Sequence, residues 1–232
     1  MIILGTNSIK DTGYNVANSC RFDDGSSDSL SRTPSSSGSS TNWTYSVWVK
    51  RSADLSTYQR LLSNGNQQGS GSQDTAIQFM LNEDTIRFDV YDNGVTRGNV
   101  DTKRKFRDTS AWYHFVFVWN TTSSTSTMNG SSTDRMQIWV NGVQETELSG
   151  HTSSAPTIPA QNANDPNTNS TSYAMRIGTR ATNYYFNGYI AEAVFIDGQS
   201  LGADSFGEFD EDSPTIWKPK DVSGLTFGTN GF

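Results

Sequence analysis

Hydrophobic and polar residues alternate with a period of two along much of this chain. The clearest alternating runs lie at residues 43–50, 77–81, 86–90, 136–140 and 189–196. Because successive side chains of a β-strand point to opposite faces, this period predicts half-buried strands and not helices. The pattern therefore predicts an all-β protein in which each strand turns one face toward a core.

Short polar turns between these runs predict hairpins. Residues 82–84, Asn-Glu-Asp, join the runs at 77–81 and 86–90. Asn141-Gly142 ends the run at 136–140, and a two-residue Asn-Gly loop favours the type I′ turn that suits twisted strands. Asn-Gly pairs begin at residues 64, 93, 129, 141, 187 and 230. We expect many chain reversals and very little helix.

Residues 112–119 are apolar on both alternating faces. This predicts a central strand, covered by the opposing sheet on one side and by loops on the other. His114 lies inside the run. We interpret it as a hydrogen-bonded core histidine and not as a metal ligand or a base.

The run at 189–196 contains a carboxylate, Glu192. Strict alternation puts Glu192 on the same face as Ile190, Val194 and Ile196. An unpaired buried carboxylate is costly, so we expect Glu192 to have a hydrogen-bond partner at a sheet edge or under a loop.

The order of apolar runs and polar stretches predicts three parts. We expect an N-terminal arm at 1–17, a β-sandwich at 18–200, and a short helical turn followed by an extended tail at 201–232. Within the sandwich, stretches rich in Ser, Thr, Asn and Pro predict long loops, which often carry binding residues. These loops span 26–41, 121–133 and 150–172.

Composition excludes several classes of protein. Ser, Thr, Asn and Gly supply 97 of the 232 residues, which rules out a coiled coil or helical bundle. The six Trp, nine Tyr and twelve Phe argue against disorder. A net charge of −7 gives no basic surface for nucleic acid, so no nucleic-acid partner is expected.

The chain also lacks signals for a membrane or for disulfides. Residues 1–4 are too short for the apolar region of a signal peptide, and the longest later apolar run, 115–119, cannot span a bilayer. The single cysteine, Cys20, forms no internal disulfide and fits assembly in a reducing cytoplasm. No membrane partner is expected.

Three motifs follow one another in a fixed order. They are Trp112-Tyr-His-Phe115, Ile-Trp-Val-Asn-Gly-Val at 138–143, and Phe186-Asn-Gly-Tyr-Ile-Ala-Glu192. Taken together, this order resembles the concanavalin A-like lectin/glucanase superfamily, in its laminin-G-like and pentraxin-like branch. The resemblance covers about residues 18–200 and implies a two-sheet antiparallel jelly roll.

Four further motifs are Asn18-Ser-Cys-Arg-Phe22, Ser31-Arg-Thr-Pro34, Phe195-Ile-Asp-Gly-Gln-Ser-Leu201 and the stretch from Phe206 to Pro219. They resemble laminin-G-like modules of tailed-phage virion proteins. This resemblance implies a non-catalytic fibre or adhesion module, located in the virion and assembled in the host cytoplasm. Its implied partners are other virion proteins, a cell-surface glycan and further copies of the chain, which we expect to form a trimer.

One alternative is a capsid decoration or cement protein that binds no sugar. Both roles need only a stable scaffold with contact loops, so the sequence does not separate them. The host, the glycan and the copy number also stay open.

Glycan recognition needs aromatic rings for stacking and amide or carboxylate groups for hydrogen bonding. The run Asn183-Tyr184-Tyr185 fits this requirement best, and Tyr58 is a second candidate. The alternative is that these tyrosines close the end of the sandwich or pack on a neighbouring subunit.

The resemblance also implies a possible calcium site, since several members of the superfamily bind calcium through loop oxygens. Asp23, Asp24 and Asp28 form the densest acidic loop and are the candidate ligands. No regular calcium-loop spacing occurs, so solvated carboxylates are the alternative and we predict no required cofactor.

A glycoside hydrolase of the β-glucanase type is a third reading, because the superfamily includes such enzymes. Those enzymes carry paired carboxylates at alternating positions of one strand. The nearest match, Glu208-Phe-Asp210-Glu-Asp212, lies outside the strong strands, and Glu192 has no carboxylate two residues away. We therefore predict no catalytic residues and no enzymatic activity.

Overall fold

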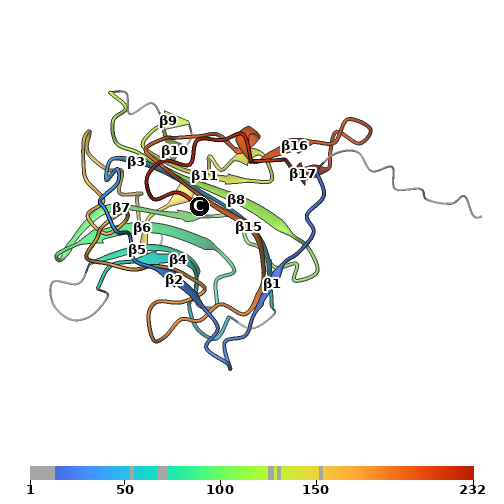
Figure 1. Ribbon diagram of the computed structural model, residues 1–232, viewed down its shortest axis with the longest axis horizontal. Coiled ribbons are helices and arrows are strands. Elements are labelled where there is room, and N and C mark those ends of the chain that lie inside the picture. The colour runs from blue at the N-terminus through green and yellow to red at the C-terminus, as the bar shows by residue number, and fades with distance from the viewer. Residues whose placement is uncertain (1–13, 53–54, 67–72, 125–127, 130–131, 152–153) are drawn as a thin grey trace, which may run out of the picture.

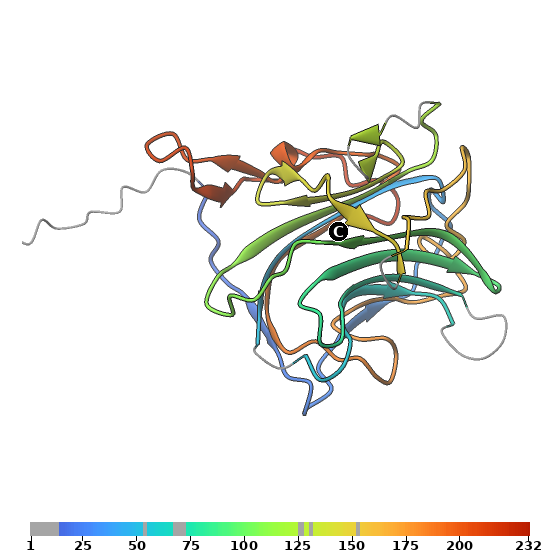
Figure 2. The same ribbon diagram turned by 180° about the vertical axis from the view of Figure 1, so that it is seen from behind.

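The computed structural model describes residues 14–52, 55–66, 73–124, 128–129, 132–151 and 154–232. Two large antiparallel sheets stack on one another to form a sandwich (Figures 1 and 2). The predicted two-sheet jelly roll is thereby confirmed. No helix in these ranges has the length and apolar character that crossing a bilayer requires.

The first sheet has eight strands, and every neighbouring pair is antiparallel. Its long strands β15, β3 and β8 lie side by side, with β1 beyond β15 and the shorter strands beyond β8. In spatial order the strands are β1 (Cys20–Phe22), β15 (Gly188–Asp197), β3 (Asn42–Arg51), β8 (Tyr113–Asn120), β11 (Met136–Val140), β10 (Ser132–Thr133) and β9 (Met128–Asn129), with β12 (Val143–Gln144) also on β11.

The second sheet has seven strands and is likewise antiparallel. Its centre is the meander β4–β5–β6–β7, which is continuous in sequence and needs only short connections. In spatial order the strands are β13 (Leu148–Ser149), β7 (Val95–Thr102), β6 (Ile86–Asp92), β5 (Asp74–Phe79), β4 (Gln59–Asn64), β14 (Met175–Ile177) and β2 (Leu30–Arg32).

Both predicted hairpins are present. Strands β5 and β6 pair from Asp74–Tyr91 to Phe79–Ile86, with the turn at 80–85 between them. At the β11–β12 turn, Asn141 and Gly142 have φ angles of 48° and 80°, as a type I′ turn requires.

Alternating side chains of both sheets meet in one central core. On β8, Phe115, Phe117 and Trp119 point inward and are fully buried. Facing them from the seven-stranded sheet, Phe88 packs 5.9 Å from Phe117 and Phe79 packs 6.1 Å from Phe115 between ring centres. These large aromatic rings supply much of the area that folding removes from water.

The outward residues of β8 are equally apolar. Val116 and Val118 form a second buried cluster with Val194 and Ile196 of β15. The cover for this cluster is the C-terminal segment, which lies across the outer side of the eight-stranded sheet (red in Figure 1). The central strand is therefore buried on both faces, as predicted, but the tail and not the loops covers its outer face.

The C-terminal segment contains more structure than an extended tail. A 3₁₀ turn, η2 (Ala203–Ser205), leads into the hairpin β16 (Gly207–Phe209) and β17 (Trp217–Pro219). Its apolar side chains pack onto the second cluster. They are Leu201, Ala203, Phe206, Trp217, Val222, Leu225 and Phe227.

A β-bulge in β15 changes the placement of Glu192. The pairing with β3 shifts register between Ala191 and Val194, and Glu192 has a φ of +46°. As a result Ile190 points into the central core, whereas Val194 and Ile196 point to the outer cluster. The expectation that Glu192 shares one face with all three was wrong, because alternation in sequence does not reveal a bulge.

Glu192 does have the expected partner. The hydroxyl of Tyr14 donates a hydrogen bond of 3.0 Å to its Oε2. This contact fixes the N-terminal segment against β15.

His114 connects β8 to the C-terminal hairpin. Its ring stacks on Trp48, with ring centres 4.8 Å apart, and meets Trp217 edge to edge, with ring centres 5.9 Å apart and ring planes 22° apart. The Trp217 indole N–H donates to Nδ1 over 2.9 Å, so the proton lies on Nε2, which donates to Ser46 Oγ over 2.8 Å. Burial lowers the pKa of His114 to about 3, and the ring stays neutral at ordinary pH. The expected hydrogen-bonded core histidine is confirmed.

Gly142 is required both by the β11–β12 turn and by the close approach of Trp217 to that turn. A Cβ on Gly142 would lie 2.4 Å from Cζ3 of the Trp217 ring. Only glycine combines the positive φ of the turn with so close an approach of the tail.

Trp217→Ala should destabilise the protein by about 2–3 kcal/mol, because it removes a half-buried ring and leaves His114 Nδ1 without its donor. Urea unfolding followed by tryptophan fluorescence measures the change. Ile216→Ala is the matched control, since Ile216 is exposed on the same segment. Equal stability of the two variants would contradict the covering role of the tail.

Candidate functional site

The outer side of the seven-stranded sheet carries charged side chains instead of an apolar cluster. On β6, Ile86, Phe88 and Val90 enter the core, so Arg87 and Asp89 point outward. Cross-strand pairing sets residues of the neighbouring strands beside them. We call this surface the polar face and define it as Arg60, Asp74, Gln78, Arg87, Asp89 and Asp101.

Ion pairs organise the polar face. Arg87 binds Asp101 with two parallel bonds, Nε–Oδ1 and Nη2–Oδ2, both 2.7 Å. Arg60 Nη2 lies 2.7 Å from Asp74 Oδ2, and Arg180 Nε lies 3.5 Å from the same oxygen. Such bidentate and shared contacts fix the directions of the guanidinium groups.

Several polar atoms of this surface have no hydrogen-bond partner within the described part of the chain. They are Nε and Nη1 of Arg60, Oδ1 of Asp74 and Oε1 of Gln78, and all are buried. Buried polar groups in native proteins normally bond to protein, water or ligand. The polar face therefore has hydrogen-bonding capacity that the chain itself does not use.

A pocket of about 330 Å³ opens at one end of the polar face. This volume falls in the usual range for small-molecule sites. His151, Ser154 and Thr157 form one wall, held by an Asn99–Thr157 bridge and by the His151 N–H, which donates to Asn99 Oδ1 over 2.7 Å. The lining residues are Arg87, Asp89, Tyr91, Thr96, Asn99, His151, Ser154 and Thr157.

Asp89 lines this pocket, and most of its surroundings are protein and not solvent. Burial raises the pKa of Asp89 to about 7, the charge of Asp74 adds to the rise, and Arg60 and Arg87 oppose it. Near neutral pH the carboxyl group therefore exists in both forms. It can donate a hydrogen bond when protonated and only accepts when ionised.

Two of the predicted tyrosines meet beside the polar face. The rings of Tyr58 and Tyr184 make an edge contact with centres 5.2 Å apart. The guanidinium groups of Arg60 and Arg180 lie 6.0 and 5.5 Å from the centre of the Tyr184 ring. The sequence pointed to Tyr58 and Tyr184 but not to the charged residues beside them, for which the only signal was the outward alternation at 86–91. The glycan-binding role of both tyrosines stays a prediction.

The backbone at Tyr184 is strained. Its φ of +57° lies in the left-handed region, which is unusual for a bulky residue. The Arg60 N–H donates to the Tyr184 carbonyl over 3.1 Å and helps hold this conformation. Strained residues that persist in this way often have a functional role.

Asn183 and Tyr185, the other two residues of the run at 183–185, do not take part in the contact between Tyr58 and Tyr184. The Asn183 carbonyl accepts from the Arg180 N–H and the Thr179 hydroxyl, while its side chain is exposed. No ring contact joins Tyr185 to Tyr58 or Tyr184 among the described residues. Their glycan-binding role stays a prediction.

The candidate calcium ligands act as acceptors within their turn. Asp28 Oδ2 accepts from the Asp23 N–H, and Asp23 and Asp24 both accept from the Gly25 N–H. Asp24 also accepts from the side chain of Asn187 over 2.7 Å. In the described ranges no three acidic, His or Cys residues group as metal ligands, and calcium binding stays a prediction.

The carboxylates of the β-glucanase-like pattern lie on the C-terminal hairpin. Glu208 and Asp210 are 3.5 and 3.4 Å from Lys218 Nζ. The hairpin covers the eight-stranded sheet, on the side of the sandwich opposite the polar face.

The chain belongs to the concanavalin A-like lectin/glucanase superfamily. A family model with the description "Concanavalin A-like lectin/glucanases superfamily" matches residues 24–199, most of the chain, and confirms the resemblance inferred from the motifs. No match was found among curated proteins.

Solved structures have similar folds. The enzymatically active domain of tailspike protein 2 of bacteriophage CBA120 is 11% identical with a TM-score of 0.51, over 90% of this chain and 30% of that chain. A SAP-like pentraxin from Limulus polyphemus is 12% identical with a TM-score of 0.42, over 84% and 90%. A Ruminococcus gnavus IT-sialidase CBM40 bound to α2,3-sialyllactose is 13% identical with a TM-score of 0.41, over 71% and 90%. At these identities the likeness concerns the fold alone.

Asp89→Asn should reduce the pH dependence of stability. Between about pH 4 and about pH 7 the unfolded chain releases the Asp89 proton while the folded protein keeps it, so stability falls as pH rises through this window. The variant side chain is neutral throughout and should show a smaller drop in Tm between about pH 5 and about pH 8. Thermal melts measure the drop, with Asp108→Asn as an exposed control. An unchanged drop in Asp89→Asn would contradict the pKa shift.

Proposed function

We propose that this protein is a non-catalytic glycan-binding module of a phage virion, and that it binds saccharide on the polar face. The observation that carries the proposal is the Tyr58–Tyr184 pair next to the guanidinium groups of Arg60 and Arg180, with a pocket lined by Arg87 and Asp89 on the same side of the sheet. Sugars combine apolar ring faces with many hydroxyls, so they need this combination of aromatic rings and planar polar groups.

Charge balance favours a polyhydroxylated ligand over a strongly charged one. Three guanidinium groups, of Arg60, Arg87 and Arg180, stand against the three carboxyl groups of the polar face. Arg87 and Asp101 neutralise one another. The remaining charged groups nearly balance, so this surface offers hydrogen-bond donors and acceptors but little net charge. The pocket beside Asp89 gives one sugar unit a recessed position.

The absence of catalysis is part of the proposal. A glycosidase needs two carboxyl groups that flank one bond and are free to act as acid and as base or nucleophile. On the polar face, Asp74 and Asp101 are each held by arginine, which leaves Asp89 as the carboxyl group with a raised pKa. Incubation with a bound oligosaccharide should release no new reducing ends, and turnover would contradict this part.

The virion role rests on the resemblance to tailed-phage modules carried by the motifs at 18–22, 31–34, 195–201 and 206–219. The chain would act as a tail or capsid fibre unit, in several copies, that contacts glycans of the host surface. Antibody labelling of intact particles in electron microscopy, with copy number counted, tests this location. Label at the tail or vertices supports attachment, whereas label over the whole shell would indicate decoration and contradict it.

Tyr58→Ala and Tyr184→Ala should each weaken glycan binding by about tenfold, equivalent to about 1.4 kcal/mol, because each removes a stacking surface. A bacterial surface-glycan array identifies the ligand, and titration calorimetry with that ligand measures the change. Tyr189→Ala is the matched control, since Tyr189 is an exposed tyrosine on β15 of the other sheet. Equal losses in all three variants would contradict a site on the polar face.

A further inference from the structure

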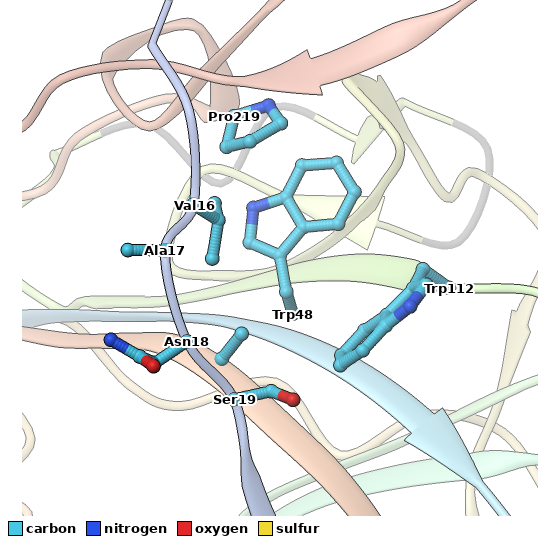
Figure 3. Close-up of a pocket in the computed structure, with 8 residues that line it drawn as sticks. Val16, Ala17, Asn18, Ser19, Trp48, Trp112 and Pro219 are labelled. Atoms are coloured by element: carbon cyan, nitrogen blue, oxygen red, sulfur yellow. The ribbon is translucent and has the colours of Figure 1, made fainter.

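A second cavity, of about 360 Å³, lies on the opposite side of the sandwich from the polar face. Figure 3 shows two indoles, Trp48 and Trp112, on one side of the N-terminal segment, with Pro219 of β17 at the far end. The lining residues are Val16, Ala17, Asn18, Ser19, Trp48, Trp112, Ala191 and Pro219. We call this cavity the indole cleft.

The N-terminal segment forms the cleft by crossing the sheet without filling the space beneath it. It is fixed at one end by the hydrogen bond from Tyr14 to Glu192 and at the other by the pairing of Cys20 with Ile190. Between these two points its side chains are small, as at Val16 and Ala17, and they leave the space open.

Both indoles are positioned for stacking. One face of Trp48 packs on His114, with ring centres 4.8 Å apart, and this contact fixes its direction. Trp112 precedes β8 and is 36% exposed, so its ring is available from solvent. Together with Val16, Ala17, Ala191 and Pro219, the indoles give the cavity the mainly apolar and aromatic lining that is typical of small-molecule sites.

The cleft also has unused hydrogen-bonding groups. Trp48 is only 9% exposed, and its buried indole N–H has no acceptor among the described residues. In Figure 3 this nitrogen faces the Val16 side of the cleft. Within the described structure the backbone of residues 15–17 likewise makes no hydrogen bond to the rest of the chain.

None of the residues that line the cleft is charged. An anionic ligand would lose its hydration without gaining a charged partner. A cation could contact the indole faces but could not accept a hydrogen bond from the Trp48 N–H. The ligand that fits aromatic faces, scattered donors and acceptors, and no charge is a neutral pyranose. We infer that the indole cleft is a second saccharide site, which stacks a neutral sugar ring on Trp112 and hydrogen-bonds it through the Trp48 N–H and the backbone at 15–17.

The inference is independent of the polar face, because the two sites lie on different sheets and share no residue. Two sites on one chain would let a single copy hold two sugars, or two points on one polysaccharide, and so raise the avidity of an assembly.

The six Trp indole N–H signals in a ¹H–¹⁵N spectrum test the inference. The probes are the neutral hexasaccharides maltohexaose, cellohexaose, xylohexaose and mannohexaose, each titrated to about 10 mM, which covers weak binding. At least one should shift the Trp48 and Trp112 signals saturably. No shift of these signals with any probe would overturn the inference.

Trp112→Ala should weaken the binding that shifts Trp48 by about tenfold or more. Because Trp112 is exposed, the variant should keep the wild-type melting temperature. Trp48→Phe keeps the stacking on His114 but loses the N–H donor, and should bind several-fold more weakly. Val143→Ala, at an exposed apolar residue of β12, is the control and should bind normally.

Tyr184→Ala separates the two sites. It should leave the Trp48 and Trp112 shifts unchanged, so failure of the polar face and failure of the cleft are distinguishable. If Trp112→Ala binds as tightly as wild type, or if a proline-rich peptide but no sugar produces the shifts, the cleft is not a saccharide site.

Discussion

The structure depends on one constraint, which is that β8 is apolar on both faces. Its inward face must be shielded from water, and it carries Phe115, Phe117 and Trp119. Its outward face must be shielded as well, and it carries Val116 and Val118. The seven-stranded sheet shields the inward face and the C-terminal segment shields the outward face. Burying both faces is what stabilises a long strand at the centre of a sheet, since the stabilisation follows the apolar area removed from water.

The way in which the two faces of β8 are covered determines which surfaces stay free to bind a ligand. The outer side of the eight-stranded sheet is largely occupied by the tail, and what is left of it beside the N-terminal segment is the indole cleft. The outer side of the seven-stranded sheet instead carries Arg60, Asp74, Arg87 and Asp89. Ion pairs between Arg60 and Asp74 and between Arg87 and Asp101 hold these side chains in place, and the proposed glycan would bind over them.

The sequence predicts those features that depend on neighbouring residues. The β5–β6 hairpin and the Asn141-Gly142 turn follow from alternation and turn chemistry, and His114 follows from its place in an apolar run. Features that depend on pairing between distant strands cannot be predicted from the sequence in this way. The bulge at Glu192 interrupts alternation without a sequence signal, and the meeting of Arg60 with Asp74 requires the register of β4 against β5. The sequence suggests Tyr58 and Tyr184 as candidate glycan-binding residues, but it does not show that their rings are in contact, because that contact depends on the fold.

A crystal structure of the protein with the best ligand from a glycan array would show directly whether the polar face binds saccharide. Sugar density should lie over the polar face, with a ring against Tyr58 or Tyr184 and hydroxyls at Arg60, Asp74 or Asp89. Density confined to other surfaces, or an array with no bound glycan, would rule out a glycan site on the polar face.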